Sequence, residues 1–142
     1  MERRSLRRLV GALTLGTLLA ALVATCSTLG QRGTRALAAA SAPEGTRIRV
    51  QVLNATTTRG LARRATMHLR DRGFDVVELG TAQQRVDTTV VLDRSGHPEW
   101  AERVARALGD ARVESRPDSS RYLDVTVLLG RSWRAPAEPF YP

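Results

Sequence analysis

In the segment 46–53, hydrophobic residues occupy every second position from Ile48 to Val52, and the alternating positions Arg47, Arg49 and Gln51 are polar. Because successive side chains of a strand point to opposite faces, this alternation predicts a strand with one buried face. The hydrophobic spacing then changes to three and four residues, which predicts an amphipathic helix over residues 59–72. A second strand is predicted at residues 74–79, so this part of the chain forms a strand–helix–strand unit.

The same succession of elements occurs a second time. A strand is predicted at residues 88–92, a helix with hydrophobic residues every four positions at 98–108, and a short strand at 112–115. When residues 52–54 are aligned with residues 91–93, the hydrophobic positions of the two helices coincide. The chain therefore contains a weak internal repeat of two β-α-β units.

A fifth strand is predicted at residues 123–129. Right-handed crossovers place the helices of both units on the same side of one sheet. The sequence thus predicts an α/β (α+β) two-layer sandwich, in which both helices cover one face of a four- to five-stranded sheet. The second face would carry the arginines of the first strand and the threonines of the last.

The N-terminal part of the chain has a different pattern, because residues 1–8 are basic and residues 9–31 contain no charged residue. About 20 apolar residues in a helix span a hydrocarbon core about 30 Å thick. Residues 9–31 are therefore predicted to be a transmembrane signal anchor. The preceding arginines predict a cytoplasmic N-terminus and an extracytoplasmic C-terminal domain, as in a single-pass protein of the cell membrane.

Two alternatives for this segment stay open. Cleavage near residues 36–40, which are mostly alanine, would release a soluble domain. A lipoprotein signal is the other alternative, with possible lipidation at Cys26, because residues 22–26 resemble a lipobox. Cys26 is also the only cysteine, so the exported domain cannot contain an internal disulfide.

Composition divides the remaining chain into three segments. Residues 32–45 are rich in Ala, Ser and Gly and are predicted to be a linker. Residues 46–131 hold all the predicted strands and helices and form the domain. Residues 132–142 contain three prolines and are predicted to be a flexible tail.

The charge and the aromatic content narrow the classes of partner. The formal net charge is +8, and every one of the 22 basic residues is an arginine, which indicates a compositional bias of the source. Binding of nucleic acid would call for a clustered basic face with stacking aromatic residues. Because aromatic residues make up only 4% of the chain, no nucleic-acid partner is predicted.

The sequence contains no pattern that carries catalysis or holds a cofactor. His68 and His97 occur without a nucleophile motif, and both are predicted to be plain surface residues. Two histidines and one cysteine do not make a zinc site, and the acidic residues lack the spacing of a calcium loop. We therefore predict a protein that is not an enzyme, with no catalytic residues, no metal and no cofactor.

The turn between the first strand and the first helix is the candidate binding site. The free N–H groups of a helix start favour anions, whereas Asn and Thr are also ordinary capping residues there, so both interpretations stay open. The second strand–helix corner lacks this polar set. The candidate ligand-binding residues are Asn54, Thr56, Thr57, Arg59, Gly60, Arg63 and Arg70.

Together, several short motifs resemble the LytR C-terminal domain family, the accessory domains often found behind the LytR-CpsA-Psr catalytic domain in bacterial envelope proteins. The resemblance covers residues 46–131, and in one departure Ala55 stands where the family often has Gly. The matching positions are Val50, 52–54 (VLN), 60–62 (GLA), Leu69, Gly73, Phe74, Val76, 89–91 (TVV), Ala101, 108–109 (LG) and 124–130 (DVTVLLG).

This resemblance implies an extracytoplasmic, non-catalytic module of the cell envelope. We expect a membrane-anchored binding module that contacts an anionic cell-wall glycopolymer or an envelope-assembly partner. The alternatives are a protein–protein interaction or regulatory subunit of an envelope complex, and a lipoprotein form of the same domain. The family supplies no assigned catalytic residues, so none is carried over.

Overall fold

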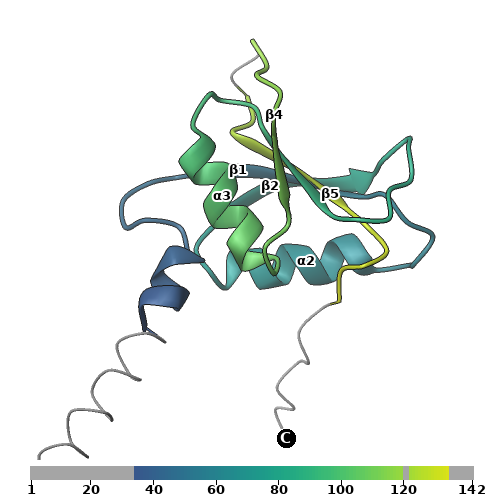
Figure 1. Ribbon diagram of the computed structural model, residues 1–142, viewed down its shortest axis with the longest axis horizontal. Coiled ribbons are helices and arrows are strands. Elements are labelled where there is room, and N and C mark those ends of the chain that lie inside the picture. Colours follow the sequence, from purple (N-terminus) through teal and green to yellow (C-terminus); the bar gives the residue numbers. More distant parts are fainter. Residues whose placement is uncertain (1–33, 120–121, 135–142) are drawn as a thin grey trace, which may run out of the picture. The chain divides into compact units, whose positions relative to one another are not determined.

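The computed structural model describes residues 34–119 and 122–134 (Figure 1). The predicted transmembrane segment 9–31 and the lipidation candidate Cys26 lie outside these residues. No helix within the described ranges is long and apolar enough to cross a membrane. The described residues from Ala38 onward form one compact unit, to which all five strands and the two helices between residues 61 and 107 belong.

The elements of this unit follow the predicted order, and two β-α-β units precede a fifth strand (Figure 1). Their ends differ from the predicted ends by a few residues at most. The elements are β1 (Arg49–Asn54), α2 (Leu61–Arg70), β2 (Asp75–Thr81), β3 (Val90–Asp93), α3 (Pro98–Ala107), β4 (Arg112–Ser115) and β5 (Val125–Leu129).

The five strands form one sheet in the order β2-β1-β5-β3-β4. β1 runs parallel to β2 and to β5, whereas β3 runs antiparallel to β5 and parallel to β4. The last strand of the chain therefore lies between the two β-α-β units and joins them. Because the units run in opposite directions, the end of β3 lies beside the starts of β1 and β5, as the pairing of Asp93 with Val125 shows.

Both helices cover the same face of the sheet, as predicted. α2 packs against β1 and β2, α3 packs against β3 and β4, and the buried residues of both helices belong to one hydrophobic cluster. The sheet contributes mainly valines, which suit a pleated surface buried under helices. The side chains of Val50, Val52, Val91, Val125 and Val127 are fully buried. The predicted α/β sandwich is therefore confirmed.

The opposite face of the sheet is less polar than predicted. Thr126 lies there as expected, and its hydroxyl donates to Gln51 Oε1 over 3.2 Å. In the strand pairing, however, Leu128 lies opposite Leu53 and Val90, so hydrophobic side chains occupy the middle of this face. The alternating polar residues of β1 correctly predicted a polar surface on that strand. They did not predict the surface of the neighbouring strands β5 and β3.

His68, predicted to be a plain surface residue, is half-buried and connects several segments. Its Nε2 lies 2.8 Å from the carbonyl oxygen of Ala107 in α3, and its Nδ1 lies 3.1 Å from Arg72 Nη1. Because a carbonyl oxygen only accepts, Nε2 donates this bond. The edge of the ring also faces Trp133, with 6.4 Å between the ring centroids. His68 thus holds α2, α3 and the C-terminal segment together.

The domain extends beyond both of its predicted ends. Trp133, placed in the tail by the sequence, is only 6% exposed and belongs to the core. In the predicted linker, residues 34–39 are helical, and Ala42 donates its backbone N–H to the carbonyl oxygen of Arg72 over 2.9 Å. Ala40 and Ala42 pack against the core, because alanine lets the backbone lie close to other elements. Composition alone does not reveal such contacts.

Candidate functional site

The corner between β1 and α2 is fixed by the side chain of Asn54. Its Nδ2 donates to the carbonyl oxygen of Thr58 over 2.8 Å, and its Oδ1 accepts from the Thr56 backbone N–H and hydroxyl at 3.0 and 2.8 Å. The Thr56 oxygen in turn accepts the backbone N–H of Thr58 at 3.0 Å. The polar side chains of Asn54 and Thr56 therefore form these hydrogen bonds within the turn itself.

The interpretation that these side chains cap the helix is wrong. The N-cap of α2 is Gly60, whose φ of 75° is left-handed, and among the described residues no side chain makes a capping hydrogen bond there. Glycine adopts this conformation without the steric cost that other residues have. Asn54 and Thr56 therefore shape the approach to the helix and leave its first N–H groups to other partners.

Replacing Asn54 with alanine removes three hydrogen bonds within this turn. We expect the free energy of unfolding to fall by about 1–2 kcal/mol, because part of the lost bonding is recovered from water. Urea unfolding of the fragment 38–142 measures this change. Thr57→Ala is the matched control, since Thr57 is exposed; equal effects of both substitutions would contradict the role given to Asn54.

The predicted arginines do not form one cluster with this corner. Arg59 is exposed just before α2, and Arg63 is exposed in its first turn. Arg70 lies in the last turn, about 10 Å further along the helix than Arg63 at 1.5 Å per residue. Its Nη2 donates to the carbonyl oxygen of Val76 over 2.8 Å. The structure therefore gathers the candidates from Asn54 to Arg63, including Thr57, near one corner and separates Arg70 from them.

A cavity of about 450 Å³ adjoins this first corner, and different arginines line it. Arg131 is paired there with Asp87 over 2.7 Å, and Arg134 donates to the carbonyl oxygen of Arg131 over 2.6 Å. Sequence reasoning missed these two residues because they belong to the segment predicted to end the domain. The lining residues are Thr58, Leu61, Arg64, Arg131, Trp133 and Arg134.

One carboxylate organises the corner between β3 and α3. This corner was not the candidate site predicted from the sequence, because it lacks the Asn and Thr residues of the first corner. Asp93 is 2% exposed, and its Oδ1 accepts the backbone N–H groups of Ser95, Gly96 and His97 at 3.1, 3.0 and 3.2 Å. Gly96 has a left-handed φ of 78°. This turn aims the side chains that follow it toward the starts of β1 and β5.

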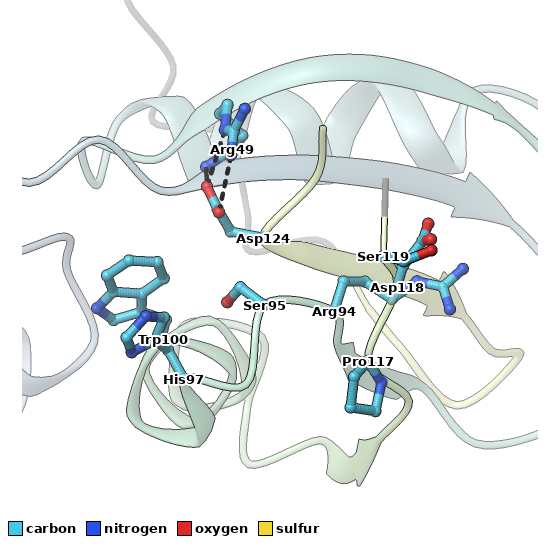
Figure 2. Close-up of a pocket in the computed structure, with 9 residues that line it drawn as sticks. All are labelled: Arg49, Arg94, Ser95, His97, Trp100, Pro117, Asp118, Ser119 and Asp124. Atoms are coloured by element: carbon cyan, nitrogen blue, oxygen red, sulfur yellow. Dashed lines mark hydrogen bonds and ion pairs between the residues drawn. The ribbon is translucent and has the colours of Figure 1, made fainter. Parts of the chain in front are cut away.

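A cavity of about 710 Å³ opens beside this second corner (Figure 2). Sites that hold small molecules have volumes of about 300–1,000 Å³. Its lining comes from the start of β1, the β3–α3 corner and the connection between β4 and β5, which the pairing of β5 with both β1 and β3 brings together. The lining residues are Arg49, Arg94, Ser95, His97, Trp100, Pro117, Asp118, Ser119 and Asp124.

An ion pair between Arg49 and Asp124 forms one side of the cavity (Figure 2). Asp124 Oδ2 accepts the Arg49 backbone N–H at 2.8 Å and Nε at 3.1 Å, and Oδ1 accepts Nη2 at 3.1 Å. Burial by itself would raise the pKa of Asp124, but the hydrogen bonds and charge of Arg49 lower this pKa below its ordinary value. The pKa of Arg49 is raised, first by its hydrogen bond to Asp124. Both groups are therefore charged at neutral pH.

Two stacked aromatic rings form one end of the cavity. The rings of His97 and Trp100 have centroids 4.1 Å apart and an angle of 27° between their planes. Trp100 is partly buried and packs against the core, whereas the His97 side chain is 51% exposed. His97 Nδ1 also lies 3.2 Å from Glu99 Oε1. The pair presents a rigid, largely apolar wall.

Polar groups form the other end (Figure 2). Arg94 is held by Nε, which donates to Thr126 Oγ1 at 3.3 Å, and by Nη1, which donates to the carbonyl oxygen of Arg116 at 3.2 Å. The backbone N–H of Asp118 donates to the carbonyl oxygen of Arg94 over 2.8 Å. Figure 2 shows Ser95 between these groups and the aromatic pair. This arrangement provides donors and acceptors at fixed positions.

The side chains around this cavity are suited to binding. Arg49 and Asp124 bond to each other, and Arg94 bonds to the Thr126 hydroxyl and to the backbone carbonyl of Arg116. In residues 34–119 and 122–134 there is no group of three or more His, Cys, Asp and Glu that could hold a metal ion. The arrangement can orient a ligand by aromatic contact and hydrogen bonds.

Fold and site together define a small α/β domain with a cavity at the junction of two β-α-β units. The family described as LytR cell envelope-related transcriptional attenuator matches residues 47–133, well over half of the chain. The chain belongs to this family, so the resemblance is confirmed, and it carries a cell-envelope-related accessory domain. None of the curated proteins and none of the solved structures matches it.

Proposed function

We propose that this protein is a non-catalytic binding module of the bacterial cell envelope. Residues 9–31 would anchor it in the membrane, and the domain would act on the extracytoplasmic side. The family membership supports a location in the cell envelope. The apolar run that follows an arginine-rich start supports membrane anchoring with a cytoplasmic N-terminus. The cavity at the second corner is the observation that carries the binding role.

Retention on purified sacculi tests this proposal, with the full-length chain solubilised in detergent. We expect the wild type to be retained and Trp100→Ala, which removes part of the aromatic wall, to lose at least about tenfold in affinity, or 1.4 kcal/mol. The triple substitution Arg59→Ala, Arg63→Ala and Arg70→Ala is expected to leave retention unchanged. If only the triple variant lost retention, the arginines of α2 and of the turn before it, and not the cavity, would carry the binding.

A second candidate function is docking of an envelope-assembly protein, and the edge strand β2 favours it. β2 has one free edge in the sheet order, and Val77 and Leu79 on it are 37% and 55% exposed. An exposed hydrophobic edge can accept a strand from a partner. Crosslinking in membranes discriminates the two functions: a specific protein adduct through β2, with no retention on sacculi, favours docking.

A further inference from the structure

We propose that the cavity at the β3–α3 corner takes an uncharged sugar ring of an envelope glycan. The C–H face of the ring would lie against the stacked pair of His97 and Trp100. Its hydroxyl or amide groups would bond to Ser95, and a neighbouring ring of the same glycan would lie at the polar end, at Arg94 and Asp118. This inference rests on the proposed function and names the ligand class of its site.

The aromatic wall selects for a ring with an apolar face. A pyranose ring carries C–H groups on its faces and hydroxyl groups around its edge. The positively polarised hydrogens of C–H groups are attracted to the negative face of an aromatic ring, and the contact removes apolar area from water. Stacking at 4.1 Å fixes the His97–Trp100 pair before a ligand arrives, so little conformational entropy is lost on binding.

Ser95 supplies an independent observation. Its Oγ is buried and has no hydrogen-bond partner among the described residues. Figure 2 shows this hydroxyl directed toward the side of the cavity where the aromatic pair lies. A buried hydroxyl without a partner is unfavourable, and native structures rarely leave one unexplained. A ligand hydroxyl or amide in the cavity would supply the missing bond.

The charges of the cavity favour an uncharged ligand. Two arginines, Arg49 and Arg94, line it together with two aspartates, Asp118 and Asp124, so their formal charges cancel. A polyanion would find no excess of positive charge here, in contrast to the cavity near the first corner with its three arginines. We therefore expect the second corner to bind the sugar part of a wall polymer and not its anionic groups.

The polar end matches the chemistry of sugar hydroxyls, each of which both donates and accepts. A guanidinium offers only donors, and an ionised carboxylate offers only acceptors. Arg94 and Asp118 lie together at the end of the cavity away from the aromatic pair, so hydroxyls of the neighbouring ring can meet one group of each kind (Figure 2). Such paired contacts would hold the neighbouring ring in one orientation.

A binding titration with the full-length chain in detergent tests this inference. The probes are a short soluble N-acetylglucosamine oligomer and, as the anionic comparison, polyphosphate; the readouts are calorimetry and tryptophan fluorescence. We expect the oligomer to bind with little dependence on salt, because no net charge is neutralised. His97→Ala and Ser95→Ala are each expected to weaken binding several-fold, and Trp100→Ala at least about tenfold.

Arg64→Ala is the matched control, since Arg64 lines the other cavity, and it is expected to bind the oligomer as the wild type does. His97 is exposed, so His97→Ala tests the wall without disturbing the core. Oligomer binding unchanged in both His97→Ala and Ser95→Ala would overturn the inference, as would binding of polyphosphate alone. If sacculi retain the protein but the oligomer does not bind, the sugar inference fails and the proposed function stands.

Discussion

Gly130→Ala is expected to lower the free energy of unfolding by at least about 3 kcal/mol, because overpacking at a site that cannot move is among the most damaging changes. A Cβ atom at Gly130 would lie 2.6 Å from the carbonyl oxygen of Asp87 and 2.7 Å from the backbone nitrogen of Thr89. It would also collide with the carbonyl carbon of Thr88. All three obstacles are backbone atoms, which cannot rotate away as a side chain can.

Hydrogen bonds keep these two segments from separating. The backbone N–H of Gly130 donates to Thr89 Oγ1 over 3.1 Å in a buried setting. Two residues further on, Ser132 donates its backbone N–H to the carbonyl oxygen of Asp87 over 2.9 Å. Relieving the collision would therefore break contacts that place β5 beside β3. Chemical unfolding of the fragment 38–142, which contains the whole core, measures the loss.

Gly80→Ala is the matched control for this substitution. A Cβ atom at Gly80 would meet only the Leu53 Cδ2 atom, at 3.3 Å, and this is the flexible end of a side chain. Its cost should stay below about 1 kcal/mol. If Gly130→Ala and Gly80→Ala lowered the free energy of unfolding by similar amounts, the close backbone contact at Gly130 would not be the cause of the loss.

The order of strands and helices could be predicted from the sequence because each element carries its own period. The alternation before Asn54 and the four-residue spacing from Trp100 to Leu108 are local signals, and tertiary packing agrees with them. The position of β5 between β1 and β3 has no such local signal. It depends on the pairing of Val125 and Val127 with strands from two different units.

The cavity at the β3–α3 corner depends on this pairing, and no local sequence signal marks it. The sequence pointed instead to the corner after β1, and the candidate ligand-binding residues there stay a prediction. The threonines after Asn54 form a polar set in the sequence. In the structure, however, Thr56 forms its hydrogen bonds within the turn. Trp100 belongs to the four-residue hydrophobic spacing that predicted α3, and in the structure it both packs against the core and lines the cavity. The short segment 93–98, DRSGHP, was the available signal for a tightly turned loop before a helix.

Asp124→Asn is expected to lower the free energy of unfolding by about 2 kcal/mol at neutral pH, because a buried carboxylate loses its charge and its bonding pattern. Asp124 is 6% exposed, and it joins the start of β5 to the start of β1. Its own backbone N–H donates back to the carbonyl oxygen of Arg49 over 3.0 Å. Asp75→Asn is the matched control. Asp75 also pairs with an arginine, but the Arg47 side chain is 76% exposed, so this loss should stay within about 0.5 kcal/mol.

The cost of Asp124→Asn should also depend on pH. Burial would raise the pKa of Asp124 in the folded state, but Arg49 lowers this pKa below its ordinary value. In the unfolded state the pKa of an aspartate is about 3.9. Between these two pKa values the unfolded state binds more protons, so the stabilisation is complete above about pH 4 and is lost as the pH falls through the folded value. Urea unfolding of wild type and Asp124→Asn at pH 7 and near pH 3 should therefore show a gap that narrows in acid. A gap of constant size would mean that Asp124 stabilises the domain by shape and not by its charge.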